Sequence, residues 1–288
     1  MNYVMNRDIK KFVYIFSKKL ITLYLPLIAL LLFTLFPFYW IINTALKKEG
    51  DILSLPVQYF PSPPTFENFV RVMTDLGFDQ FFVNSMIVTL TTCFLVILIA
   101  LLGGYAIARF NFKGKGFVFI ILFATQIFPR ALLLVPLFLT FRAFDLIDTR
   151  IPLILTYTTL QIPFCTIMIC GFFIMIPKEI EEVAMIDGCS RLDVIFRVLI
   201  PIIKPGIVAT IAFCFVASWN EFIFALMFTY KEKLFTLPVG LYTLIGQYQI
   251  YYGGMSAGGV ITLIPTLIMF AYLQKHLIKG LTAGAVKG

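Results

Sequence analysis

The residues best suited to specific chemistry gather in a charged stretch at residues 178–201, between two long apolar segments. Three glutamates, Glu179, Glu181 and Glu182, stand at the start of a predicted short helix, where acidic side chains suit the positive end of the helix dipole. Gly188 then interrupts the helical pattern. A short acidic helix followed by a glycine turn and more helix favours docking against another surface rather than bond-making chemistry.

The second half of this stretch predicts another helix. Ser190 can cap its start, because Asp193 follows three residues later as in a capping box. Apolar side chains recur on one face at i, i+3, i+4 and i+7, namely Leu192, Ile195, Phe196 and Leu199. We expect Pro201 and Pro205 to end the helix. An amphipathic helix of this kind also suits an ordinary loop on the lipid surface, so the pattern alone leaves both interpretations open.

Motifs for catalysis are missing from the sequence. The single histidine is His276, so neither a His-paired nucleophile nor an HExxH zinc site can be built. The sequence has no GxxxxGK[ST] phosphate loop, so we do not expect the chain to hydrolyse ATP itself. The five cysteines lie mostly in apolar runs with neither metal-ligand nor paired spacing. We therefore predict a protein with no catalytic residue, no metal site and no cofactor of its own.

Two charged residues fall inside apolar segments, where a charge is costly unless it faces a partner or a wet cavity. Arg130 follows Pro129, and a broken helix there would let it line a pathway or reach the membrane surface. Glu221 belongs to the run Ser218-Trp219-Asn220-Glu221-Phe222. That run can relay protons or join helices by hydrogen bonds, and the second role is the commoner one. Arg130, Asn220 and Glu221 are therefore candidates for pathway or helix-packing residues.

The overall composition defines the class of protein. Hydrophobic residues make up 60% of the chain and charged residues only 13%, whereas an average soluble domain has about 25% charged residues. This indicates a polytopic membrane protein surrounded by lipid. The net charge of +8 does not indicate a nucleic-acid partner, because the basic residues sit in short loops and form no dense patch.

Six apolar segments are long enough to cross about 30 Å of hydrocarbon. They are residues 21–46, 81–108, 117–141, 151–176, 206–228 and 255–273. Pro129, Arg130 and Pro136 interrupt the third of them. The sequence thus predicts an all-α, multi-pass membrane protein with six transmembrane helices. Residues 229–254, rich in Tyr and Gly, are expected to pack on the membrane surface rather than to span it.

Lysine and arginine are unevenly distributed over the connecting segments. Fifteen lie in residues 1–19, 109–116, 177–204 and 275–288, and seven in residues 44–83, 142–150 and 229–255. The positive-inside rule then places both termini and the 178–201 stretch in the cytoplasm. The expected organisation is a cytoplasmic tail at 1–19, a transmembrane domain at 20–276 with an external loop at 44–83, and a cytoplasmic tail at 277–288.

The charged stretch resembles the EAA motif of the permease subunits of ATP-binding-cassette (ABC) importers. That motif reads Glu-Ala-Ala, three residues, Gly, nine residues, Ile, one residue and Leu-Pro. The matching positions are Glu182, Val183, Ala184, Gly188, Val198, Ile200 and Pro201. Val183, Val198 and Ile200 differ from the family residues by mild aliphatic exchanges. The resemblance implies that these residues, with Glu181 and Asp187, couple the chain to a partner ATPase.

Further stretches narrow the resemblance. Residues 37–40 (PFYW), 218–222 (SWNEF), 236–241 (TLPVGL) and 279–288 (KGLTAGAVKG), in this order, are similar to the carbohydrate-uptake permeases of the maltose type, specifically the member with six spans. This similarity implies the type I ABC importer permease fold in a bacterial cell (inner) membrane. It also implies import of a sugar or oligosaccharide.

The resemblance implies several partners. They are a second permease subunit, a dimer of an ABC ATPase that holds ATP and Mg, and an extracellular or periplasmic sugar-binding protein. The loop expected to contact the binding protein includes Gly246, Gln247, Tyr248, Gly253 and Gly254. The tail at 281–288 resembles one that also reaches the ATPase interface.

The residues leave other functions open. An importer of the same class could carry glycerol phosphate or another polar solute, because the shared motifs describe coupling and not cargo. A proton-coupled secondary transporter would use Arg130 and Glu221 directly and would need no ATPase. A membrane enzyme would need paired acids or a nucleophile within a span, and the sequence shows neither.

Overall fold

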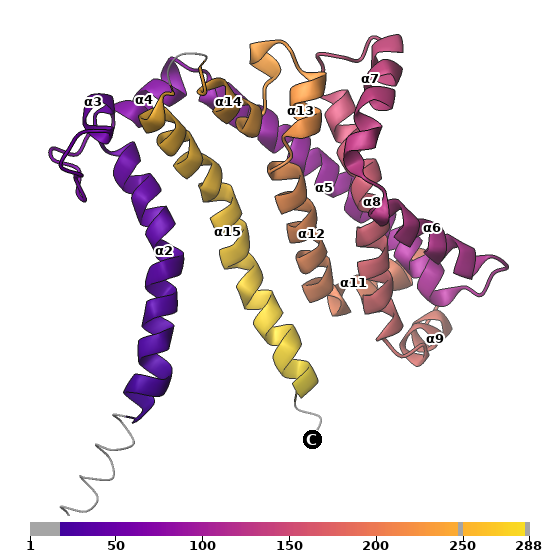
Figure 1. Ribbon diagram of the computed structural model, residues 1–288. Coiled ribbons are helices and arrows are strands. Elements are labelled where there is room, and N and C mark those ends of the chain that lie inside the picture. The colour runs from indigo at the N-terminus through magenta and orange to yellow at the C-terminus, as the bar shows by residue number, and fades with distance from the viewer. Residues whose placement is uncertain (1–17, 247–249, 286–288) are drawn as a thin grey trace, which may run out of the picture.

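The chain is almost entirely helical in the computed structural model, which describes residues 18–246 and 250–285 (Figure 1). Four helices are long and apolar enough to cross a membrane. They are η1 with α2 (Leu20–Tyr24 and Leu25–Ala45), α5 (Phe78–Arg109), α8 (Ile151–Ile174) and the first part of α15 (Tyr252–Ala285). Two bent helix pairs also qualify, so the described residues provide up to six crossings if each pair is one span.

The first bent pair is the interrupted third segment. Helix α6 (Lys115–Ile127) ends before Pro129, and the chain resumes as η2 (Arg130–Leu133) and α7 (Leu134–Ala143) at an angle of 92°. Proline favours this break because the residue before it is pushed out of the helical region. Phe128 accordingly has an extended backbone, with ψ of 127°. The interruption predicted from the sequence is confirmed.

The fifth segment differs from the continuous span predicted at 206–228. Helix α12 (Lys204–Trp219) stops, and α13 (Ile223–Phe228) begins separately. Side chains compete here for backbone hydrogen bonds, which disfavours a continuous helix. Asn220 Nδ2 donates to the Val216 carbonyl at 3.0 Å, and the Glu221 carboxylate accepts from the backbone N–H of Phe224 at 2.9 Å. The polar run at 218–222, considered above as a proton relay or a helix-packing site, therefore lies at the end of a helix.

The centre of the molecule is the packing of α5 against α8, with α12 against both. Gly104 lets α5 approach the backbone of α8 closely. A Cβ added at this position would lie only 2.9 Å from the backbone nitrogen of Cys170 on α8. Buried aromatic and aliphatic side chains fill the remaining space, and Phe173 and Trp219 are among the largest. The three helices thus pack closely against one another.

Several boundaries differ from the predicted ones. Helix α5 begins at Phe78, so the end of the predicted external loop 44–83 is helical, and that loop also holds α3 (Glu49–Ile52) and α4 (Glu67–Thr74). Helix α15 continues to Ala285, so most of the predicted tail 277–288 is helical. Residues 229–254 do not simply lie on the membrane surface. Helix α14 (Leu237–Thr243) packs on α5, and its Leu237 and Val239 are buried.

The two ends of the bundle carry different elements (Figure 1). Helix α9 (Glu179–Ile186), which belongs to the charged stretch, lies near the same end as the C-terminal part of α15. Helices α3, α4 and α14 lie at the opposite end. Helix α2 stands to one side, and its most apolar 18-residue window is not buried at all within this chain. So much apolar surface on one helix must face lipid or another subunit.

Candidate functional site

The charged stretch forms the helix–turn–helix that its sequence predicts. Helix α9 carries Glu179, Glu181 and Glu182 in its first turn. Gly188 has a φ of +88°, in the left-handed region that glycine enters without strain. An added Cβ there would meet nothing within 4 Å, so the backbone angle alone makes glycine the favoured residue. The turn therefore fixes the direction in which the chain leaves α9.

A capping box starts the second helix, as predicted. Ser190 Oγ accepts from the backbone N–H of Asp193 at 3.2 Å, and the Asp193 carboxylate accepts from the Ser190 N–H at 3.3 Å. Such reciprocal bonds satisfy two amide groups that a helix start leaves free. Arg197 adds an ion pair with Asp193, with Nε 3.1 Å from Oδ1. This helix runs from Arg191 to Ile202 as α10 (Arg191–Asp193), η3 (Val194–Leu199) and α11 (Ile200–Ile202).

Only half of the predicted apolar face of this helix is buried, namely Ile195 and Leu199. Leu192 is 60% exposed and Phe196 is 47% exposed, whereas Val194, Ile195 and Leu199 are buried. The reason is that residues 194–199 form a π-helix, whose wider turn rotates side chains away from the 3.6-residue pattern. The helix ends at Ile202, between Pro201 and Pro205, as expected from these prolines. Leu192 and Phe196 therefore remain as an apolar surface on this side of the chain.

The residues assigned to coupling divide into an exposed and a buried set. The exposed ones are Glu182, Val183, Asp187, Gly188 and Pro201. Val198 and Ile200 are half-buried, and Ala184 and Glu181 are buried against the bundle. The exposed set presents carboxylates beside apolar side chains at one end of the molecule. Such a surface can receive both hydrogen bonds and apolar contacts from a partner protein.

Glu181 is held by groups that the sequence did not single out. Arg109 at the end of α5 donates from Nε to Glu181 Oε1, and Tyr105 OH donates to Oε2 at 3.1 Å. Arg109 Nη2 also donates to the Ile176 carbonyl at 3.0 Å. The paired side chains are 7% and 8% exposed. Arg109 marks the end of an apolar run in the sequence, but nothing there shows which acid it meets.

Of the residues considered for a pathway, Arg130 lies in η2, whereas Asn220 and Glu221 lie together at the break between α12 and α13. Arg130 is exposed in η2, at the break between α6 and α7. Asn220 is exposed, and within the described part of the chain its side chain bonds to the Val216 carbonyl on α12. Glu221 is half-buried and accepts a hydrogen bond from Tyr157 OH on α8 at 2.5 Å. Ser218 instead accepts from Gln161 Nε2 at 2.7 Å. Ser218 and Glu221 therefore both bond to α8, whereas Asn220 bonds back to α12.

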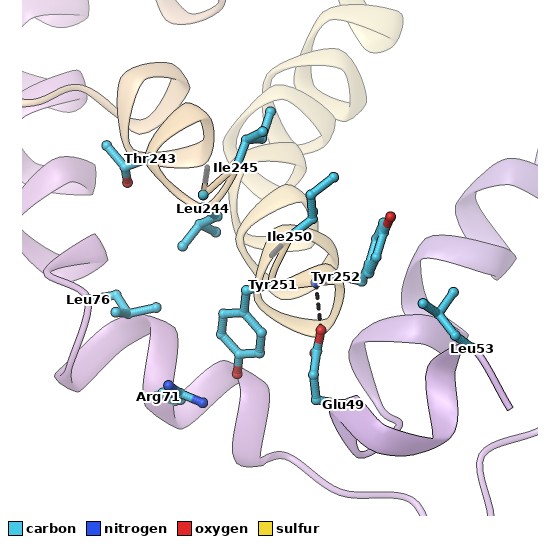
Figure 2. Close-up of a pocket in the computed structure, with 11 residues that line it drawn as sticks. Glu49, Leu53, Arg71, Leu76, Thr243, Leu244, Ile245, Ile250, Tyr251 and Tyr252 are labelled. Carbon is cyan, nitrogen blue, oxygen red and sulfur yellow. Dashed lines mark hydrogen bonds between the residues drawn. The ribbon is translucent and has the colours of Figure 1, made fainter. Parts of the chain in front are cut away.

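A pocket of about 900 Å³ lies at the opposite end of the bundle, between α3, α4, the end of α14 and the start of α15 (Figure 2). Glu49 caps α15, because its carboxylate accepts from the backbone N–H groups of Tyr252 and Gly253, both at 2.8 Å. The Arg71 guanidinium lies 4.8 Å from the centre of the Tyr251 ring. The pocket thus combines aromatic rings with charges of both signs.

The predicted binding-protein loop lies at this pocket in part. Gly246 lines it, and Gly253 and Gly254 are buried at the start of α15. Gln247 and Tyr248 lie outside the described residues. Tyr251 OH donates to Asn68 Oδ1 at 2.9 Å, and burial raises the pKa of this hydroxyl despite the nearby Arg71 charge. Among the described residues, no group of three or more His, Cys, Asp or Glu could hold a metal ion.

Comparison with known proteins identifies the family. The model of the family described as binding-protein-dependent transport system inner membrane component matches residues 96–282, which include the charged stretch. The chain belongs to this family. It is therefore a membrane component of a transport system that depends on a binding protein, as its EAA-like motif indicated.

Individual relatives agree with this assignment. The chain is 39% identical over 254 residues to the sulfoquinovosyl glycerol transport system permease protein SmoH of Agrobacterium fabrum, covering 88% of this chain and 89% of the relative. It is 33% identical over 273 residues to the trehalose/maltose transport system permease protein MalG of Thermococcus litoralis, covering 94% and 98%. The resemblance to carbohydrate permeases is thereby confirmed.

A solved structure shows the fold. A chain of a bacterial ABC transporter involved in the import of the acidic polysaccharide alginate matches with a TM-score of 0.78, at 22% identity. The match covers 91% of this chain and 96% of that chain. The all-α fold of an importer permease, expected from the sequence, is therefore confirmed.

Proposed function

We propose that this chain is a permease subunit of an ATP-driven importer that carries a sugar or oligosaccharide into the cytoplasm. The observation that carries the proposal is the segment from Glu182 to Pro201, built from α9, the Gly188 turn and the capped second helix, in which Glu182, Val183 and Asp187 are exposed. The segment has the spacing of the coupling motif, with aliphatic exchanges at Val183, Val198 and Ile200, and it lies at one end of the bundle (Figure 1).

We place this end in the cytoplasm. The positive-inside rule supports the assignment, because fifteen Lys and Arg residues lie in the segments of this side and seven in those of the other. Both termini are then cytoplasmic. The partner at this end is a separate ATPase dimer that binds ATP and Mg, since the chain lacks a phosphate-binding loop of its own.

The opposite end would receive the binding protein. The pocket between α3, α4 and α15 supports this role, because Arg71, Glu49 and two tyrosines line it. Tyrosine and arginine are enriched at protein interfaces. A second permease subunit would pack against an apolar surface of the bundle, and the transport pathway would lie between the two subunits.

The cargo class is inferred from the relatives. Their names cite sulfoquinovosyl glycerol, trehalose or maltose, and a structural neighbour imports alginate. All of these contain sugar units, although they differ in charge and length. A carbohydrate cargo is therefore the best-supported one.

Transport would follow alternating access. Dimerisation of the ATPase subunits with bound ATP would move the 178–201 segments of the two permease subunits together, and the bundles would open outward. ATP hydrolysis would reset them. Glu181 joins α9 to α5 by hydrogen bonds from Tyr105 and Arg109. A displacement of the charged stretch would therefore also pull on the end of α5, in the core of the bundle.

Uptake by proteoliposomes tests the proposal. The chain would be co-purified with its gene neighbours, reconstituted with ATP enclosed on the cytoplasmic side, and supplied with binding protein and a panel of labelled oligosaccharides. We expect uptake of one saccharide that requires ATP and persists when a protonophore collapses the proton gradient. Uptake that needs the gradient and not ATP would contradict the proposal and favour a secondary transporter.

A further inference from the structure

Helix α5 is joined to the charged stretch at one of its ends. Arg109 and Tyr105, one turn apart on α5, both bond to the Glu181 carboxylate. Arg109 also bonds to the Ile176 carbonyl, in the turn that connects α8 to α9. A single arginine thus holds both α9 and the segment leading into it.

This junction resists separation. Breaking a buried ion pair by removing one partner leaves an uncompensated charge and is strongly unfavourable. Here the carboxylate has two donors on α5, and the guanidinium has a second acceptor at Ile176. A hydrogen-bonded network of this kind fixes geometry as well as contributing stability. We expect α9 to follow the end of α5 when the charged stretch is displaced.

The same helix is joined to the external side at its other end. Asn84 Nδ2 donates to the carbonyls of Lys233 and Phe235, both at 2.9 Å, and Asn84 Oδ1 accepts from Arg150 Nη2 at 2.7 Å. Ser85 Oγ accepts from the backbone N–H of Leu237 at 2.8 Å. These bonds hold the external segment 232–243, which comprises η4 (Glu232–Leu234) and α14, on the first turns of α5.

We propose that α5 is the element that transmits movement between the coupling stretch and the external segment 232–243. Asn84 and Glu181 act as positioning residues at its two ends. Twenty-five residues separate Asn84 from Arg109 on one unbroken helix, a length of about 38 Å at 1.5 Å per residue. The inference rests on the proposed function, because it assigns a path to the coupling that this function requires.

Other routes through the chain are less direct. Helix α12 is bent by 83° from the helix at 191–202, and it ends at Trp219 before the break that precedes α13. Helix α8 reaches α9 only through residues 175–178, where the Ile176 carbonyl is itself held by Arg109. Helix α8 is also unbroken, but among these three helices α5 is the one whose own side chains bond to both segments.

A double-mutant cycle on the intact complex tests this role. Glu181→Gln weakens the cytoplasmic junction while keeping its shape, and Asn84→Asp removes both N–H donors while keeping a partner for Arg150. The readout is the ratio of ATPase rates with and without saccharide-loaded binding protein. We expect each change to lower this ratio about two- to thirtyfold, the range for changes along a coupling path. The double variant should be no worse than the more affected single variant, because either change already interrupts one path.

A matched control separates coupling from stability. Gln161→Leu removes another buried bond between helices, to Ser218, that lies at neither end of α5. We expect it to lower the thermal stability of the complex but to leave the ATPase ratio unchanged. If the two single changes multiply in their effect on the ATPase ratio of the double variant, the role of α5 is wrong. An equally large fall of the ratio in Gln161→Leu would also overturn that role. Neither result would contradict the proposed function. A wild-type complex without any stimulation would instead overturn the proposed function, and the inference with it.

Discussion

The hydroxyl of Tyr157 on α8 donates a 2.5 Å hydrogen bond to the carboxylate of Glu221, at the break between α12 and α13. The same carboxylate accepts from the backbone N–H groups of Phe224 at 2.9 Å and Ala225 at 3.2 Å. Glu221 thus caps a helix that starts inside the bundle and ties it to α8. An intramembrane acid whose oxygens are occupied in this way has a structural explanation.

Glu221→Gln distinguishes this structural role from a proton relay. The amide keeps one oxygen acceptor and the side-chain shape but cannot exchange a proton at neutral pH. We expect ATP-dependent uptake to continue at a reduced rate, and Tyr157→Phe to destabilise the bundle by about 1 kcal/mol through loss of one hydrogen bond. Complete loss of uptake in Glu221→Gln, with normal uptake in Tyr157→Phe, would favour the relay.

Gly188 is predicted to tolerate asparagine better than alanine. Its φ of +88° is in a region that costs a residue with a Cβ about 1–3 kcal/mol, and asparagine is among the residues that enter it most readily. Stimulated ATPase should therefore fall in the order glycine, asparagine, alanine. Gly116→Ala on α6 is the control, because it has open space and a helical backbone. Equal activity of Gly188→Ala and wild type would show that the turn geometry is not required.

Asp148 is predicted to give the protein an acid-sensitive contact. Its Oδ1 accepts from the backbone N–H groups of Tyr230 at 2.6 Å and Lys231 at 2.9 Å. Partial burial raises the pKa of this carboxyl, but the two N–H groups and the Lys231 charge outweigh it, so the pKa lies below its usual value. The carboxylate thus contributes stability above the unfolded pKa of about 3.9, and the contribution is lost as the pH falls through the folded pKa.

The measurement is thermal unfolding of wild type and Asp148→Asn, followed by tryptophan fluorescence. At pH 7 the variant should unfold about 2–4 °C lower, as expected for the loss of about 1 kcal/mol in a chain of this size. Below the folded pKa the two proteins should unfold together. A difference that stays constant as the pH falls below the folded pKa would show that the charge of Asp148 is not involved.

Arg71 is predicted to act in binding-protein recognition. Its guanidinium stacks on Tyr251 at the pocket between α3, α4 and α15, and arginine held in this way presents its remaining N–H donors to a docked partner. We expect Arg71→Glu to raise the concentration of binding protein needed for half-maximal ATPase stimulation, with the maximal rate unchanged. Arg142→Glu, at an exposed position at the end of α7, is the control. Equal shifts in both variants would indicate a general charge effect.

The sequence predicted the class of fold well because its strongest signals are local. Apolar length located the spans, and the residue types at 188, 190 and 193 predicted the turn and the capping box. The predictions that failed concern a helix end and a buried face, where local hydrogen bonding departs from the regular α-helical pattern. Side-chain hydrogen bonds at Asn220 and Glu221 ended a span that apolar length would have continued, and π-helical winding at 194–199 changed which side chains are buried.

The candidate site was predicted in part for the same reason. The coupling stretch is contiguous, so its motif can be read directly from the sequence. The residues that hold it in place are distant in the chain, since Arg109 lies 72 positions before Glu181. Likewise, Glu49 meets the start of α15 only in the folded chain. One sequence cannot show such pairs, because neither partner carries a local pattern.

The most direct test of the coupling claim is the stimulated ATPase activity of purified complexes carrying Glu182→Lys. Glu182 is exposed on α9, so the change leaves the bundle core intact while reversing the charge of the docking surface. Glu179→Lys is the matched control, because it makes the same change in the same helical turn outside the motif. We predict that the complex assembles, that Glu182→Lys reduces stimulation by loaded binding protein to the basal rate, and that Glu179→Lys largely retains it. Full stimulation in Glu182→Lys would contradict the proposal that residues 178–201 couple this chain to its ATPase.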